Sequence, residues 1–218
     1  MHCGLKSNCC KSSLSTKASL PVPFRRACDQ NQYKKPMNTN QQYDTAIESC
    51  KTIFLQKTKD YGTSWRVYRI ISVADQIYIK AKRIRTIQEN GTQKIDDDIV
   101  SEFKGILNYG IIGLIQLDIH DDGLEDLPYE TVEQLYNEKV VIAKRLMEDK
   151  NHDYGEAWRE MSQESFVDLV LAKILRIKQI LINKGKTIIS EGIDANFFDI
   201  INYAVFGLIL IDEEKHAS

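Results

Sequence analysis

Apolar residues recur at helical spacing along most of the chain, and no strand-like alternation of apolar and polar residues occurs. Ala46, Ile47, Cys50, Ile53 and Phe54, for example, follow the three- and four-residue spacing of one helical face. Helices are predicted over residues of about 40–58, 65–89, 96–120, 130–150, 157–183 and 193–213. We therefore expect an all-α fold with six helices.

Turn residues separate the predicted helices. Gly62 follows the first helix, and Asn90-Gly91 ends the second. Thr63 or Ser64 is expected to cap the second helix, and the acids at 96–98 are expected to start the third.

The six helices are predicted to form two copies of one three-helix unit. KTKDYGTSWR at 57–66 recurs as KNHDYGEAWR at 150–159, an offset of 93 residues that becomes 94 after one inserted residue. Polar residues keep their identity between the copies: Ser72, Asp75, Lys80, Arg83 and Asn108 match Ser165, Asp168, Lys173, Arg176 and Asn202. We expect a tandem duplication with repeat 1 over 39–121, a linker over 122–128 and repeat 2 over 129–215. The two repeats should pack as one globular domain, a six-helix bundle with pseudo-twofold symmetry.

The third helix of each copy is predicted to be buried. Residues 106–117 are apolar on nearly every side, and Gly113 and Gly207 permit a close helix–helix approach. The two third helices are expected to cross at the pseudo-twofold axis. Asn108 and Asn202 would then be buried amides that need hydrogen-bond partners.

The first 36 residues differ from the rest, with seven Lys or Arg against one acid and no apolar periodicity. Residues 1–38 are interpreted as a disordered leader, as a mis-assigned start preceding Met37, or as a targeting or nucleic-acid-binding tail. Four of the five cysteines lie in this segment without zinc-ligand spacing, and Cys50 is expected to be a small core residue. The absence of a disulfide framework favours a reducing, cytoplasmic location.

Bulk composition argues against two classes of partner. The net charge of −2 gives no electrostatic case for nucleic-acid or membrane binding, and no apolar run reaches the roughly 18 residues that span a bilayer. We expect an intramolecular pseudo-dimer that is monomeric or weakly oligomeric.

The second helix carries the repeated polar residues on one face, away from its apolar stripe. Within the helix, Asp75 cannot pair with Lys80, which is 140° away, or with Arg83, which is two turns away. Lys80 and Arg83 lie three residues apart without an acid in reach on their helix, an arrangement typical of a phosphate site. Two interpretations remain open: a functional polar face, or a structural network of salt bridges between the copies.

The K-x-x-D-Y-G-x-x-W-R element is the most distinctive motif. Its glycine turns the chain, and Tyr61 and Trp65 are expected to pack on neighbouring helices. An aromatic pair beside cations can also hold a nucleobase, whereas Asp60 can cap a helix or coordinate a metal. His120-Asp121-Asp122 is interpreted as an acidic linker rather than a set of metal ligands.

The paired K-x-x-D-Y-G-x-x-W-R elements, each followed by S-x-x-D-x(4)-K-x-x-R-I and then N-Y, resemble the nucleotide modification associated domain family of bacteria and phages, formerly a domain of unknown function. The resemblance covers residues of about 40–215. It implies a link to modified nucleotides or to phage DNA modification.

A looser resemblance is to the MazG-like all-α nucleoside triphosphate pyrophosphohydrolases, whose acids hold magnesium. Here Asp98 and Glu102 occur only in copy one and Asp199 only in copy two. A magnesium site would therefore need Asp60 and Asp75 to converge, or their copy-two equivalents.

Three functions follow as hypotheses. In the first, the protein binds or processes a nucleotide with Mg²⁺, as a (pyro)phosphohydrolase if it is an enzyme. The metal or catalytic residues would be Asp60, Asp75, Asp153 and Asp168, and the nucleotide would contact Lys80, Arg83, Lys173, Arg176, Trp65, Trp158, Asn108 and Asn202. In the second, the protein is a non-catalytic helical module whose repeated polar residues hold the copies together. In the third, it is a DNA-binding accessory factor that uses the basic leader.

Overall fold

The computed structural model describes residues 38–91, 98–119, 126–186 and 191–217. Within these ranges the chain forms six α-helices and two short 3-10 turns, and it contains no strand. The elements are α1 (Thr39–Tyr61), η1 (Ser64–Val67), α2 (Ile70–Asn90), α3 (Ile99–Asp118), α4 (Tyr129–Tyr154), η2 (Ala157–Glu160), α5 (Gln163–Ile182) and α6 (Ile193–Ala217). The all-α prediction and the two three-helix copies are confirmed.

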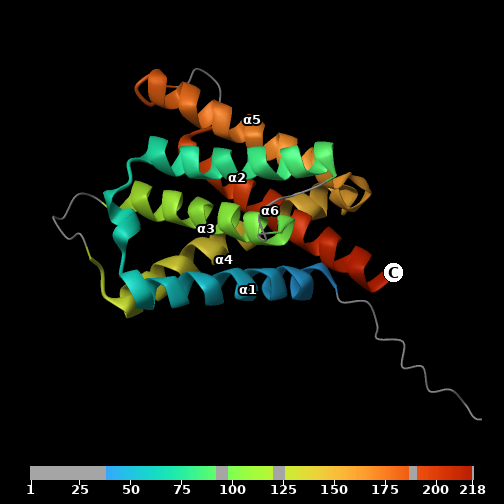
Figure 1. The fold of residues 1–218 in the computed structure, drawn as a ribbon, viewed down its shortest axis with the longest axis horizontal. Coiled ribbons are helices and arrows are strands. Elements are labelled where there is room, and N and C mark those ends of the chain that lie inside the picture. Colours follow the sequence, from blue (N-terminus) through green and yellow to red (C-terminus); the bar gives the residue numbers. More distant parts are fainter. Residues whose placement is uncertain (1–37, 92–97, 120–125, 187–190, 218) are drawn as a thin grey trace, which may run out of the picture. The chain divides into compact units, whose positions relative to one another are not determined.

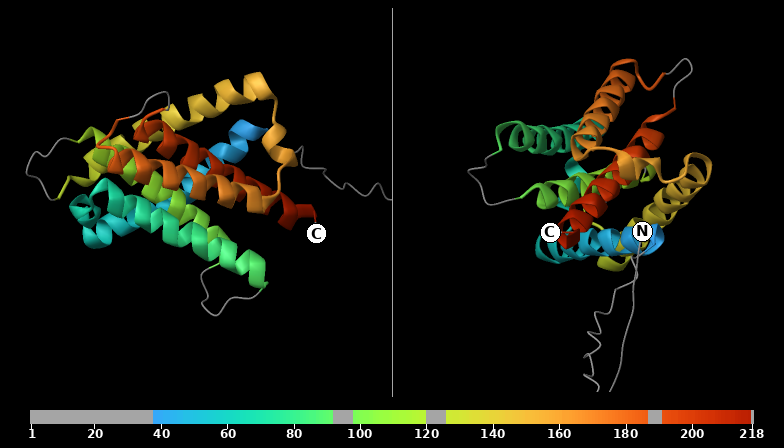
Figure 2. Two further views of the ribbon diagram at one scale, coloured as in Figure 1. Left: turned by 90° about the horizontal axis from the view of Figure 1, so that it is seen from above. Right: turned by 90° about the vertical axis from the view of Figure 1, so that its right-hand side faces the viewer.

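The helices lie in three layers, each containing one helix from each copy (Figure 1). The central pair, α3 and α6, packs against α2 and α5 on one side and against α1 and α4 on the other. Figure 2 shows the same arrangement from above and from one end. The layers explain why the third helix of each copy is apolar on nearly every side: it has neighbours on both faces.

The two central helices cross through a reciprocal fit of glycine and phenylalanine. A Cβ placed on Gly113 would lie 2.6 Å from Cζ of Phe197, and one placed on Gly207 would lie 2.8 Å from Cζ of Phe103. Phe103 and Phe197 are equivalent residues in the two copies, so each copy inserts its ring into the other copy's glycine notch. This isologous contact confirms the predicted close approach of the third helices about a pseudo-twofold axis.

Helix ends follow the predicted turn residues except at the start of the second helix of each copy. Gly62 ends α1 with φ 62°, and Gly91 ends α2 in the left-handed region with φ 64°, which suits glycine. The Asp98 side chain caps α3 by accepting a 2.8 Å hydrogen bond from the amide of Ser101.

In copy one the second helix begins at Ile70 rather than near residue 65, and in copy two it begins at Gln163 rather than near residue 157, because a 3-10 turn precedes it in each copy. The predicted cap at Thr63 or Ser64 is wrong because Thr63 serves another contact. Its amide and hydroxyl both donate to Asp126 Oδ1 at 2.9 Å, and its hydroxyl accepts from the amide of Leu127. Thr63 therefore ties the turn before α2 to the segment before α4. Residues 1–37 of the predicted leader, the acids at 96 and 97, and residues 120–125, which include the start of the linker predicted over 122–128, lie outside the described residues.

Cys50 and most of the apolar stretch of α6 lie in the core of the bundle. Cys50 is fully buried, as predicted, and burial raises the pKa of its thiol to about 12. In α6, residues Ile193–Glu214 are long and apolar enough to cross a membrane by length and composition, but 67% of the apolar window is buried within the bundle. The apolar side chains of α6 therefore have partners inside the protein.

Candidate functional site

The repeated aspartates of α2 and α5 form ion pairs between the copies. Lys178 donates to Asp75 at 2.6 Å, and Arg85 donates to Asp168 at 2.8 Å. Arg85 and Lys178 are themselves equivalent positions, so the two pairs are reciprocal. The aspartates are about half exposed, which keeps the value of each pair to about 0–1 kcal/mol. This geometry matches the proposed network between copies.

Lys80 and Arg83 both lie against a buried acid on the next helix of their own copy. Glu102 on α3 is 4% exposed; it accepts a 3.0 Å hydrogen bond from Lys80 and a second bond from Arg83. No acid on α2 itself is in reach of these cations, as predicted. The helical wheel of α2 could not show that α3 supplies one.

In copy two, a different acid pairs with the lysine of the second helix. The position of Glu102 is occupied by Asn196, and Asp199 lies one turn further on, where copy one has Gly105. Asp199 accepts hydrogen bonds from Lys173 and, at 2.5 Å, from Lys150. Burial opposes a charge on Lys150, but the hydrogen bond and negative charge of Asp199 outweigh it and raise the pKa of this lysine. Arg176 is exposed and has no ion-pair partner among the described residues.

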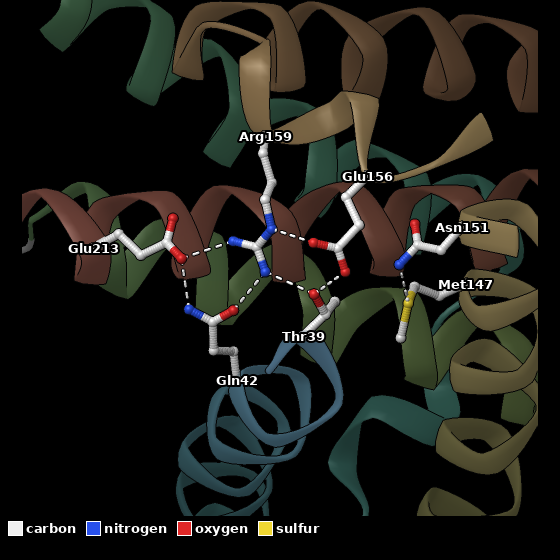
Figure 3. A network of polar contacts seen from close by, with 7 residues as sticks. All are labelled: Thr39, Gln42, Met147, Asn151, Glu156, Arg159 and Glu213. Atoms are coloured by element: carbon white, nitrogen blue, oxygen red, sulfur yellow. Dashed lines mark hydrogen bonds and ion pairs between the residues drawn. The ribbon is translucent and has the colours of Figure 1, made fainter. Parts of the chain in front are cut away.

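The arginine of the repeated motif anchors the 3-10 turn in both copies. Arg159 donates hydrogen bonds to Glu156 at 2.6 Å and to Glu213 at 2.7 Å, and its Nη2 also donates to Thr39 and Gln42 on α1 (Figure 3). In copy one, Nη1 of Arg66 donates to Gln116 on α3 at 2.6 Å. The arginine of the motif therefore joins the turn to helices distant in the sequence.

The four predicted aspartates do not form one carboxylate cluster. Asp60 and Asp153 are exposed near the C-terminal ends of α1 and α4, while Asp75 and Asp168 pair across the α2–α5 contact. Among the described residues, no group of three or more His, Cys, Asp or Glu side chains lies close enough to hold a metal ion. The convergence that a magnesium site would need is not found in the described part of the chain.

Asn108 and Asn202 have the partners that buried amides need. Oδ1 of Asn202 accepts a 2.9 Å hydrogen bond from the Tyr43 hydroxyl, and its Nδ2 donates to the Ala143 carbonyl. Asn108 repeats this arrangement with the Tyr136 hydroxyl at 3.0 Å and the Cys50 carbonyl. Both amides join the first and third helices across the copies, and each keeps a second N–H and a second lone pair beyond these bonds.

Copy one contains a cavity of about 470 Å³ between the end of α1, the η1 turn, α2 and α3. Three lysines line it: Lys57, Lys80 and Lys104. Five aromatic residues also line it: Phe54, Tyr61, Trp65, Tyr68 and Tyr109. Of the predicted site residues, this cavity brings together Lys80, Trp65 and Asn108, whereas Arg83 and the aspartates lie outside its lining.

Lys57, Lys104, Tyr68 and Tyr109 were missed as candidates by sequence reasoning. Lys57 and Tyr109 recur as Lys150 and Tyr203, so the internal repeat contained the signal for two of them. Burial, together with the neighbouring Tyr68, raises the pKa of Tyr109, which keeps its phenol neutral and able to donate.

The two tryptophans of the motif differ in their surroundings. Trp158 stacks on Phe206 with ring centroids 4.2 Å apart, and the Arg159 guanidinium lies 4.4 Å from its ring centroid. Trp65 has Ile112 where copy two has Phe206, and its nearest ring partner is Phe54 at 6.5 Å. In both copies the indole Nε1 is buried without a hydrogen-bond partner among the described residues, so this feature belongs to the fold rather than to the cavity.

The chain matches none of the curated proteins and none of the solved structures with which it was compared. Two of its segments, residues 57–117 and 150–211, match the family described as Nucleotide modification associated domain 1. Each match runs from the K-x-x-D-Y-G element through the third helix of one copy. Because the two matches span more than half of the chain, the protein belongs to the nucleotide modification associated domain 1 family, with the domain present in two copies.

Proposed function

We propose that copy one binds a nucleotide in the cavity beside the η1 turn, with its phosphate on the lysines and its base against the aromatic residues. The observation that carries this proposal is the presence of three lysines and five aromatic residues around one cavity of about 470 Å³. That volume lies within the range of roughly 300–1,000 Å³ that is usual for small-molecule sites. The family to which the chain belongs supports a nucleotide as the ligand class.

The lysines are suited to bind an anion. Lys57 and Lys104 form no ion pair or hydrogen bond within the described part of the chain, and Lys80 shares Glu102 with Arg83. The positive charge around the cavity is therefore only partly neutralised. Lysine ammonium groups bind phosphate as point charges, and their long stems allow them to follow a flexible ligand.

The aromatic residues are suited to bind a base. Tyr68 and Tyr109 lie with ring centroids 6.5 Å apart, and Tyr61 is 65% exposed at the rim. Stacking of a nucleobase on an aromatic side chain contributes roughly 1–3 kcal/mol and tolerates any base, because every base has a π-face. This supports recognition of nucleotides as a class.

The residues of the cavity do not fit a resident magnesium ion. Glu102 is the carboxylate among its lining residues, and two cations already hold it. Magnesium binds through carboxylates that are free to coordinate it. The proposal is therefore one of nucleotide binding, and no step of hydrolysis is assigned to these residues.

A second candidate function is that of a helical interaction module. The reciprocal pairs Asp75–Lys178 and Asp168–Arg85 favour it, because they assign repeated polar residues to the contact between copies. The two proposals use different residues, so one chain can satisfy both.

Thermal unfolding of the full chain with nucleoside mono-, di- and triphosphates, with and without Mg²⁺, tests the nucleotide proposal. A ligand at 100 times its Kd should stabilise the fold by about 2.7 kcal/mol. Lys57→Glu should abolish this shift, whereas Lys82→Glu should preserve it, because Lys82 is an exposed lysine of α2 outside the cavity. If no nucleotide stabilises the protein, the proposal is wrong and the interaction module is favoured.

A further inference from the structure

We infer that Asp199 stands in for a ligand's phosphate in copy two, so that copy one holds the open anion site and the chain binds one ligand. This inference rests on the nucleotide site proposed above and deepens it by placing the phosphate. It uses the duplication as an internal comparison, because each copy shows what the other lacks.

Copy two shows how this fold holds an anion. Lys150 and Lys173 converge on the Asp199 carboxylate, which is 6% exposed. Their equivalents in copy one are Lys57 and Lys80, and both line the cavity. The same two positions are therefore able to bring two ammonium groups onto one negatively charged group.

Copy one has no carboxylate at that position: its buried acid, Glu102, lies one turn earlier on α3 and accepts from Lys80 and Arg83. Gly105 occupies the position of Asp199, and a Cβ added there would lie 2.7 Å from Cε of Lys80 and 3.0 Å from its Nζ. The Lys80 stem thus crosses the space that a side chain fills in copy two. Lys57 has no anionic partner among the described residues, so its ammonium is available.

The rest of the cavity has diverged in the same direction. Phe198 and Phe206 replace Lys104 and Ile112, and Phe206 stacks on Trp158. Copy two therefore has an aromatic ring in place of the Lys104 cation. A second ring, that of Phe206, takes the place of Ile112 and fills more space beside the tryptophan. Each exchange removes something that a phosphate-bearing ligand would use.

A phosphate fits copy one better than a carboxylate. In copy two, Asp199 binds two lysines. Copy one has the equivalents of both, Lys57 and Lys80, and adds Lys104 as a third cation. A phosphate monoester carries about −1.5 to −2 charges near neutral pH and three acceptor oxygens, whereas a carboxylate carries one charge. The ligand group is thus the phosphate of a nucleotide, placed between Lys57 and Lys80 beside Gly105.

Isothermal titration of the full chain tests this placement, with AMP, ATP, inorganic phosphate and pyrophosphate as probes. We expect one ligand per chain. Gly105→Asp should place a carboxylate in the anion position, as copy two does, and weaken binding by about 100-fold or more through like-charge repulsion and occupied lysines. Glu102→Asn combined with Gly105→Asp reproduces the copy-two pair and should weaken binding at least as much.

Gly105→Asn is the matched control. It adds nearly the same volume without the charge, so a placement based on charge predicts a much smaller loss than that of Gly105→Asp. Lys80 is a flexible side chain that can move aside, and far-UV circular dichroism checks that both variants fold.

The outcomes separate this inference from the nucleotide proposal. Two ligands per chain, an unchanged affinity in Gly105→Asp, or equal losses in the Asp and Asn variants would overturn the inference even if nucleotides bind. Binding of phosphate or pyrophosphate that Gly105→Asp abolishes, without any preference for a nucleotide, would support the anion site and overturn the nucleotide proposal. If none of the probes binds, both are wrong.

Discussion

The Tyr43 hydroxyl donates a 2.9 Å hydrogen bond to Oδ1 of Asn202, and these two buried residues belong to different copies of the repeat. The equivalent bond runs from Tyr136 to Asn108 at 3.0 Å. Each bond connects the first helix of one copy to the central helix of the other. The two copies are therefore linked at the core as well as by the surface ion pairs.

Tyr43→Phe should destabilise the protein more than Tyr136→Phe. Removing either hydroxyl leaves an amide oxygen without its donor, at a cost of about 1–3 kcal/mol. Asn202 is 4% exposed and cannot easily recruit water, whereas Asn108 lies partly exposed at the cavity. Urea unfolding measures both costs, and equal costs would show that the cavity does not hydrate Asn108.

Stability should fall as the pH rises above about 9. Burial raises the pKa of Cys50 from 9.0 to about 12 and the pKa values of Tyr43 and Tyr136 above 10.0, with neighbouring acids adding to the shifts of the tyrosines. Above these ordinary values the unfolded chain loses protons that the folded chain keeps. Each such group then lowers the free energy of unfolding by about 1.4 kcal/mol per pH unit until it titrates in the fold.

Urea unfolding between about pH 8 and about pH 11 measures this slope. The Tyr43→Phe and Tyr136→Phe double variant should show a shallower decline than the natural chain, because two of the groups with raised pKa values are gone. A slope unchanged by this double variant would contradict the assignment to these tyrosines.

Asp75→Asn and Asp168→Asn should each cost less than about 1 kcal/mol, because both ion pairs are substantially exposed. The cost should shrink further at high salt, which screens exposed charges. Nucleotide affinity should not change, since neither aspartate lines the cavity. Loss of nucleotide affinity without loss of stability would instead show that Asp75 or Asp168 contributes to the binding site.

The sequence predicted the architecture because duplication and helical periodicity are local or repeated signals. Gly113 and Gly207 predicted the helix crossing. The repeated asparagines predicted buried amides, which is confirmed for Asn202, whereas Asn108 is partly exposed at the cavity. The phenylalanines that fill the glycine notches were not predicted, because a helical wheel shows which face is apolar but not which residue of another helix meets it.

The site was predicted only in part, for the same physical reason. Lys80 and Trp65 do line the cavity, but Glu102 reaches Lys80 and Arg83 from a different helix, and Lys178 reaches Asp75 from the other copy. Partners of this kind depend on tertiary packing. The sequence shows that copy one has its acid at Glu102 and copy two at Asp199. It does not show which lysines each acid binds, because that depends on how the helices pack.

Glu102→Gln should lower stability while it strengthens phosphate binding. Glu102 is buried and holds both Lys80 and Arg83, and breaking a buried pair costs about 3–5 kcal/mol when the remaining charge stays dry. Here the lysine and arginine side chains are 27% and 23% exposed, so water can reach them and we expect a loss of roughly 1–3 kcal/mol.

The expected gain in affinity has a separate cause. Glu102 competes with an incoming phosphate for the Lys80 ammonium, and glutamine removes the negative charge while keeping the shape of the side chain. Urea unfolding and titration with pyrophosphate on the same preparation measure the two effects together. Asp199→Asn is the matched control, because it also removes a buried acid from two lysines but in the copy without the open cavity: it should lower stability and leave pyrophosphate affinity unchanged. If both variants lose stability and neither binds pyrophosphate more tightly, Glu102 supports the fold without competing for Lys80.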